Sequence, residues 1–127
     1  MSNYRDLTVW NAARALAVSC YRSTQDFPRA EEYGLTSQIR RAAVSIAANI
    51  AEGTQRGSDR ELIRFVRIAR GSAAELETLL ELAGEVGLLT PQHATSLLDR
   101  TGDVGRMLSG LARSLNASNH RPITKSN

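Results

Sequence analysis

LTSQIRRAAVSIAANIAEG, the segment from Leu35 to Gly53, decides the fold of this chain. Its apolar residues Ile39, Ala43, Ile46 and Ile50 recur at steps of four, three and four. That spacing returns to the same side of an α-helix, so the segment predicts a helix with one buried stripe. Polar side chains occupy the remaining positions, which is typical of a helix that packs on neighbours through one face.

The ends of this helix are predicted from residues that favour helix termini. Thr36 is the expected N-cap, with Leu35 as the apolar residue that precedes it. Gly53 is expected to follow the last turn, where a left-handed residue commonly ends a helix. The sequence therefore predicts a helix over residues 36–52.

Three further helices are predicted, over residues 6–24, 59–86 and 91–115. The first has its apolar stripe at Leu7, Trp10, Ala13, Ala17 and Cys20, with Leu16 and Tyr21 beside it. The third carries an apolar repeat at Leu62, Phe65, Val66, Ala69, Ala73, Leu76, Leu80 and Ala83. The fourth carries one at Ala94, Leu97, Thr101, Val104, Leu108, Leu111 and Leu115.

Cap signals separate these helices. Ser58 with Glu61 forms the sequence pattern of a capping box at the start of the third helix. Gly87 is expected to end that helix, and Thr90 followed by Pro91 is an N-cap with proline at the first helical position. The connections are short, so neighbouring helices should run in opposite directions. We therefore predict an all-α domain over residues 1–115, an antiparallel up-down-up-down four-helix bundle. Residues 116–127 lack periodicity and are predicted to be a disordered tail.

Bulk composition agrees with one globular domain and points to the cytoplasm. The chain has 127 residues, of which 42% are hydrophobic and 5% aromatic. It has one cysteine, Cys20, so a disulfide framework is excluded, and we interpret this thiol as a small buried apolar group. The sequence has neither an N-terminal signal pattern nor an apolar run near the ~20 residues of a membrane span.

Enzymatic chemistry is not predicted. The only histidines are His93 and His120, and neither stands in a Glu-x-x-His pair or another metal-ligand spacing. Phosphate-binding loops of the Walker and dinucleotide types are absent from the sequence. We therefore expect a protein with no catalytic residues, no metal, no cofactor and no small-molecule substrate.

Arginines supply the main candidate binding surface. Fifteen of the sixteen basic residues are arginine, and the middle of the chain is basic whereas residues 71–103 are acidic. Steps of four and three place Arg60, Arg64 and Arg67 on one helix face. The candidate nucleic-acid-binding residues are Arg40, Arg56, Arg60, Arg64 and Arg67, which would contact backbone phosphates of RNA or DNA. A solvated face paired with Asp59 and Glu61, or a surface that holds other protein subunits, remains an open interpretation.

A second set of polar residues flanks the apolar stripes of the second and third helices. Because polar side chains at the edge of a core need partners, we expect a network between these helices. Its predicted members are Arg41, Asn49, Glu52, Ser72 and Glu75, with Arg40 as an alternative cation.

Four blocks of the sequence resemble a known family. They are Arg5-Asp6-Leu7 with Val9-Trp10, residues 33–42 (YGLTSQIRRA), residues 49–53 (NIAEG), and Gly71-Ser72 with Glu75-Leu76-Glu77. In this order they resemble the 23S rRNA intervening-sequence protein family, also called four-helix bundle protein. The resemblance extends over most of the chain, to Leu115.

The resemblance implies a small, non-enzymatic, cytosolic bacterial protein that assembles into a homopentamer. Some genes of the family lie within insertions in rRNA genes, and distant relatives accompany diversity-generating reverse transcriptases and bind nucleic acid. From the resemblance we expect this chain to bind copies of itself.

Overall fold

A computed structural model describes residues 3–119 of the chain. The described residues form four α-helices: α1 (Thr8–Ser23), α2 (Leu35–Thr54), α3 (Asp59–Glu85) and α4 (Pro91–Asn119). Two short 3-10 helices, η1 (Tyr4–Asp6) and η2 (Arg29–Glu31), flank α1. No strand occurs between residues 3 and 119, which confirms the predicted all-α class.

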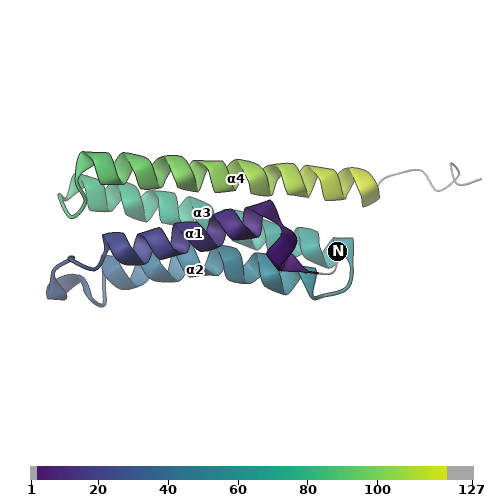
Figure 1. Ribbon diagram of the computed structural model, residues 1–127, viewed down its shortest axis with the longest axis horizontal. Coiled ribbons are helices and arrows are strands. Elements are labelled where there is room, and N and C mark those ends of the chain that lie inside the picture. The colour runs from purple at the N-terminus through teal and green to yellow at the C-terminus, as the bar shows by residue number, and fades with distance from the viewer. Residues whose placement is uncertain (1–2, 120–127) are drawn as a thin grey trace, which may run out of the picture.

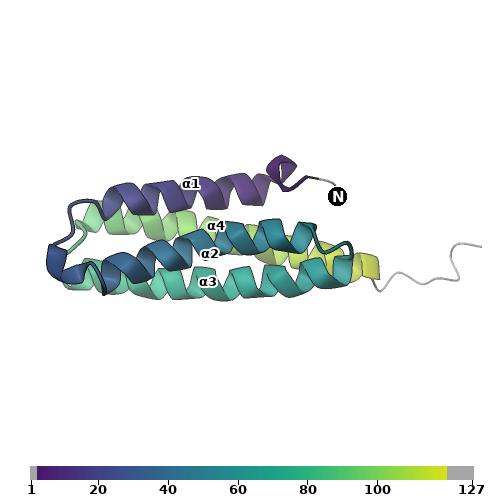
Figure 2. The same cartoon turned by 90° about the horizontal axis from the view of Figure 1, so that it is seen from below.

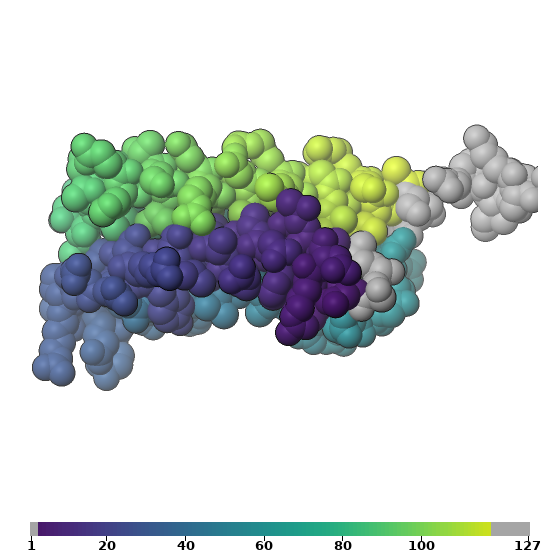
Figure 3. All heavy atoms as spheres, viewed as in Figure 1, coloured from purple at the N-terminus to yellow at the C-terminus, as the bar shows by residue number. Residues whose placement is uncertain are grey.

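The helices lie side by side along one long axis, and successive helices run in opposite directions (Figures 1 and 2). α1 packs on α2 and α4, and α3 packs on the same two helices. α1 and α3 are therefore diagonal in the bundle and point in the same direction. The connection from α1 to α2 protrudes at one end of the molecule (Figure 3).

The core is built from the predicted stripes of α2, α3 and α4. Ile39, Ile46 and Ile50 of α2 are fully buried, as are Leu76 and Leu80 of α3. Thr101 of α4 is also buried, and its hydroxyl donates to the Leu97 carbonyl oxygen at 2.7 Å. Residues between 3 and 119 leave no buried side-chain nitrogen or oxygen without a hydrogen-bond partner.

The buried face of α1 differs from the prediction. Its core residues are Val9, Ala13, Leu16 and Cys20. Trp10 is only half-buried, and Tyr4 of η1 meets its ring edge-on at a centroid separation of 5.0 Å. The large indole thus lies at the margin of the bundle, because the smaller Val9 and the branched Leu16 fill the space between α2 and α4.

Cys20 is buried as predicted. Burial raises the pKa of its thiol from an ordinary 9.0 to about 11, and the positive charge of Arg100 acts in the opposite direction.

Alkaline pH should therefore destabilise the protein through Cys20. The unfolded thiol ionises near pH 9 while the folded thiol stays neutral until about pH 11, so stability present below pH 9 is lost as the pH rises through this window. The loss should approach about 1.4 kcal/mol per pH unit. Urea unfolding of the wild type and of Cys20→Ala from pH 8 to 11 measures it; equal pH slopes in the two proteins would contradict the assignment.

The turn between α3 and α4 forms as predicted. Gly87 adopts φ +81°, its N–H donates to the Gly84 carbonyl at 3.2 Å, and the Leu88 N–H donates to the Ala83 carbonyl at 2.9 Å. This pair of bonds is a Schellman motif, and Leu89 is buried directly after it.

The predicted N-caps of α3 and α4 are also present. Ser58 Oγ accepts from the Glu61 N–H at 3.1 Å, and Thr90 Oγ1 accepts from the His93 N–H at 3.2 Å. Each bond satisfies one amide that the first helical turn leaves unpaired.

Removing either cap should weaken the bundle modestly. Ser58→Ala and Thr90→Ala are each expected to lower the free energy of unfolding by about 1 kcal/mol, because one helix-end amide loses its partner. Chemical denaturation of each variant measures the effect. Ser58→Asp, which keeps an acceptor oxygen, serves as the control and should retain most of the stability.

The predicted ends of α2 are wrong at both termini. The helix begins at Leu35, one residue before the predicted cap Thr36, and Glu31 Oε1 accepts from the Leu35 N–H at 3.2 Å. Gly53 does not end the helix, which runs to Thr54; the left-handed glycine of this turn is Gly57, with φ +89°.

Gly53 is instead needed for close packing. A Cβ atom at this position would lie 2.8 Å from the Phe65 Cβ and 3.0 Å from Leu62 Cδ1. Its missing side chain therefore lets the end of α2 approach the start of α3.

α4 is longer than the sequence predicts. It extends to Asn119, so residues 116–119 are helical rather than part of a tail. The remaining residues of the predicted tail, 120–127, lie outside the described residues.

Candidate nucleic-acid interface

Four of the predicted arginines gather at one end of the bundle. Arg56 lies in the α2–α3 turn, and Arg60, Arg64 and Arg67 lie on the first half of α3; all four are exposed. We call these four residues the arginine face. Gly57 and the Ser58 cap fix the turn that brings Arg56 next to α3.

Phe65 lies beneath this face and holds two of its members. The guanidinium carbons of Arg56 and Arg64 are 4.9 Å and 5.4 Å from the centre of the Phe65 ring. Phe65 itself is buried, as predicted, at the end of the core where Gly53 packs. The two guanidinium groups therefore lie over an apolar surface that orders them through cation–π contact.

The ion pairs of the arginine face are weak enough to be displaced. Arg56 lies 2.8 Å from a Glu52 carboxylate oxygen, and Arg64 lies 3.5 Å from one of Glu61. Both are exposed pairs within one helical turn, and such pairs contribute only about 0.3–0.5 kcal/mol. A phosphate group, which accepts two guanidinium N–H bonds, can compete for the same donors.

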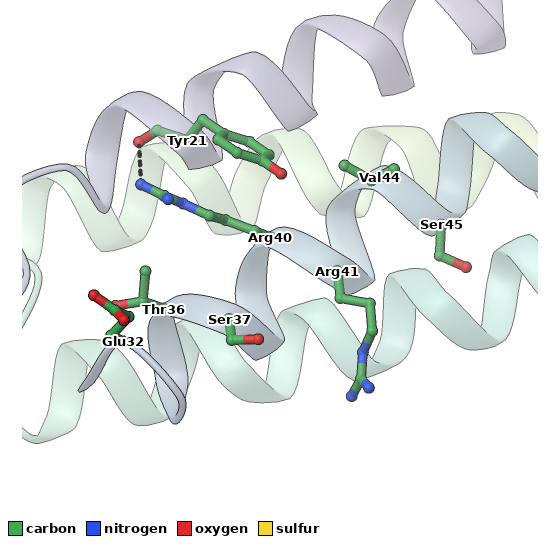
Figure 4. A pocket seen from close by; sticks show the side chains of 8 residues that line it. All are labelled: Tyr21, Glu32, Thr36, Ser37, Arg40, Arg41, Val44 and Ser45. Carbon is green, nitrogen blue, oxygen red and sulfur yellow. Dashed lines mark hydrogen bonds between the residues drawn. The ribbon is translucent and has the colours of Figure 1, made fainter. Parts of the chain in front are cut away.

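Arg40 lies apart from the arginine face, near the start of α2 at the other end of the bundle. Its Nε donates to Thr24 Oγ1 at 2.9 Å, and a terminal nitrogen donates to the Tyr21 carbonyl at 3.3 Å (Figure 4). Its guanidinium also lies 4.6 Å from the Tyr21 ring centre. Arg40 thus donates to one hydroxyl and one carbonyl at the end of α1 and supplies positive charge at the C-terminus of this helix, which gives it a structural role.

The structure brings together only part of the predicted polar network. The hydroxyls of Ser45 and Ser72 lie 2.8 Å apart and connect α2 to α3, and the Asn49 side-chain amide donates to Ser45 Oγ at 2.9 Å. Ser45 was not among the predicted members.

The other predicted members lie outside this hydrogen-bonded group. Glu52 pairs with Arg56, whereas Arg41 and Glu75 are exposed. Figure 4 shows Arg41 pointing away from Arg40 and α1. The reason is geometric: Arg41 and Glu52 lie on the outer side of α2, and Glu75 lies on the outer side of α3.

Two hollows lie beside α2 on the outer surface. One, of about 570 Å³, is lined by Tyr21 of α1 and by Thr36, Ser37, Arg40 and Arg41 of α2 (Figure 4). The apolar one, of about 660 Å³, runs from Trp10 to Tyr21. Across residues 3–119, no group of three or more histidine, cysteine, aspartate or glutamate side chains is arranged to hold a metal ion.

The fold and these surfaces define a small four-helix bundle whose most distinctive charged feature is an exposed arginine face. Residues 5–110 match the family described as 23S rRNA-intervening sequence protein, and the chain belongs to this family. This confirms the resemblance found in the sequence.

A solved structure supports the same assignment. It is described as a protein with unknown function from the S23 ribosomal protein family of Bacteroides thetaiotaomicron VPI-5482. It is 26% identical in sequence and superposes with a TM-score of 0.75, covering 83% of this chain and 98% of the other. No curated protein matches the chain. None of the helices described in residues 3–119 is both long and apolar enough to cross a membrane.

Proposed function

We propose that this protein is a non-enzymatic cytoplasmic bundle that assembles with copies of itself and binds nucleic acid through backbone phosphates. The observation that carries the nucleic-acid part is the arginine face: four exposed guanidinium groups on one end of the bundle, two of them ordered over Phe65. Since Arg40 is engaged with α1, the proposed contacts are Arg56, Arg60, Arg64 and Arg67.

The chemistry of the face favours phosphates over bases. Its aromatic residue, Phe65, is buried under the arginines and offers no ring on which a base could stack. Binding should therefore depend weakly on base sequence and strongly on salt. Four contacts from one subunit predict a slope of log affinity against log salt of about −3 to −4.

Self-assembly strengthens this mode of binding. A homopentamer, the number implied by the family resemblance, would present five arginine faces, and the joint attachment of several faces raises affinity without any new type of contact. Sedimentation equilibrium tests the assembly, and a clean monomer at micromolar concentration would contradict it.

The nucleic-acid proposal is tested with Arg60→Glu combined with Arg64→Glu. A fluorescent oligonucleotide is titrated at 50 and 200 mM salt, and the oligomeric state is measured in parallel. We expect weaker binding, a salt slope less steep by about two per bound subunit, and an intact oligomer. Arg29→Glu combined with Arg41→Glu is the matched control, because it makes the same charge change at exposed positions of the opposite end.

An interaction scaffold without nucleic acid is the second candidate function. The acidic second half of α3 favours it, because Glu75, Glu81 and Glu85 are exposed and could pair with arginines of another subunit. Loss of the oligomer in the Arg60→Glu, Arg64→Glu variant would favour this function. Wild-type protein that shows no salt-dependent binding would end the nucleic-acid proposal.

A further inference from the structure

The apolar hollow between α1 and α2 is a groove made by small side chains. Ala47, Ala48 and Ala51 of α2 face Ala17 and Val18 of α1, so the two helices leave space between them on their outer side. Val18 and Val44 are exposed although both are apolar. This groove of about 660 Å³ is lined largely by apolar groups and bordered by Arg14 and Arg22.

A second apolar surface lies on the far side of the bundle. On α3, Ile68, Glu75 and Leu82 follow one another at steps of seven, so they lie on the outward side, opposite the buried core positions. Leu82 is 45% exposed and the neighbouring Val86 is 65% exposed. We call Ile68, Glu75, Leu82 and Val86 the outer stripe of α3.

The charges beside this stripe are poorly placed for an isolated subunit. Glu85 and Glu81 lie at the C-terminal end of α3, whose last turn has no basic residue. Negative charge at a helix C-terminus opposes the macrodipole and disfavours the helix. Within residues 3–119, neither carboxylate forms an ion pair. A positive group from outside the subunit would relieve this conflict.

Groove and stripe match in direction, length and charge. α1 and α3 run in the same direction and end at the same end of the bundle (Figures 1 and 2), so α3 of one copy can lie parallel to the groove of another. Arg14 and Arg22 are separated by about 12 Å along α1, and Glu75 and Glu85 by about 15 Å along α3. Rotation about an axis inclined to the bundle would also move the second copy along the bundle and bring each arginine close to one glutamate.

We propose that the outer stripe of α3 docks into the α1–α2 groove of a second copy of this chain. Leu82 and Val86 would fill the apolar groove, while Glu75 and Glu85 pair with Arg14 and Arg22. The two surfaces lie on different sides of the subunit, so the contact is heterologous and repeats from copy to copy until a ring closes. The inference rests on the proposed self-assembly and names its surfaces.

Apolar substitutions give the first test, by sedimentation velocity over a concentration series. Leu82→Ser with Val86→Ser should weaken self-association by about a hundredfold or more, since both side chains would be central interface anchors. Met107→Ser is the control, because Met107 is similarly exposed, at 38%, but lies on α4 outside both surfaces. Circular dichroism should show the same helix content in all variants.

Charge exchange gives the second test. Arg14→Glu with Arg22→Glu, and separately Glu75→Arg with Glu85→Arg, should each abolish assembly, whereas all four changes in one chain should restore it. The Glu75→Arg, Glu85→Arg variant should melt no lower than a wild-type sample diluted to monomer, because it removes the conflict with the α3 macrodipole. This separates lost docking from lost folding.

The outcomes distinguish this inference from the proposal on which it rests. A monomeric wild type would overturn self-assembly itself, and the docking surfaces with it. If the wild type is an oligomer and the Leu82→Ser, Val86→Ser variant and both charge-reversal variants remain oligomeric, the docking surfaces alone would be overturned. Assembly lost in each charge variant without recovery in the fourfold variant would also overturn the proposed pairing.

Discussion

Leu76→Ala is expected to lower the free energy of unfolding by about 2–5 kcal/mol. Leu76 lies near the middle of α3 and is fully buried among residues of the core. Removing three side-chain carbons both loses apolar burial and leaves a cavity that the tightly packed neighbours can fill only in part. Urea or guanidinium denaturation, followed by circular dichroism, measures the loss.

The ranking of variants is the sharper check. Leu76→Ala should cost more than Ser58→Ala or Thr90→Ala, because a core truncation exceeds the loss of one cap hydrogen bond. Met107→Ala, at an exposed position of α4 outside both proposed docking surfaces, is the control and should change stability little. If either cap variant lost more stability than Leu76→Ala, the assignment of the buried face of α3 would be wrong.

Gly53→Ala should also destabilise the protein, by about 1–3 kcal/mol, although alanine is the better helix former. The new Cβ would lie 2.8 Å from the Phe65 Cβ and 3.4 Å from the Leu62 Cα, so α2 and α3 would have to separate. The displacement would also disturb the ring over which Arg56 and Arg64 lie.

Gly71→Ala provides the opposite expectation at a matched helical position. Gly71 is exposed in α3, and a Cβ there would meet no atom within 4 Å. This change should stabilise the bundle by about 0.5–1 kcal/mol, the ordinary helix-propensity difference. If Gly53→Ala were stabilising to the same extent, close packing would not be the reason for glycine at position 53.

Periodicity made the bundle predictable from the sequence. The steps of three and four in α2, α3 and α4 identify their buried faces, because each apolar stripe is long. In α1 the same method selected Trp10 in place of Val9. Size and hydrophobicity favour the indole, but the position of η1 and of the neighbouring helices decides which residue is central, and neither follows from the local pattern.

The helix ends were predictable where the chemistry is local. The bonds of Ser58, Thr90 and Gly87 each join residues within one turn, so the sequence contains both partners. At Gly53 the deciding contact is with Phe65 of another helix. A glycine near a helix end has the same appearance in a sequence whether it supplies a left-handed turn or close packing.

The arginine face was predictable along α3 but not between helices. Spacing alone places Arg60, Arg64 and Arg67 together, and the short connection adds Arg56. Arg40 was included because it lies on the adjoining helix, yet antiparallel packing carries it to the opposite end. Likewise, Ser45 was not among the predicted members of the polar network, because only the register of α2 against α3 places it beside Ser72.

The antiparallel arrangement of the helices has an electrical consequence for the whole molecule. Neighbouring helices point in opposite directions (Figures 1 and 2), so their macrodipoles largely cancel. The lasting charge separation then comes from side chains, with the arginines at the start of α3 and the glutamates toward its end. Each subunit is thus a rod with a dipole moment along its axis. In the field of a polyanion it should turn before contact, so that the arginine end arrives first.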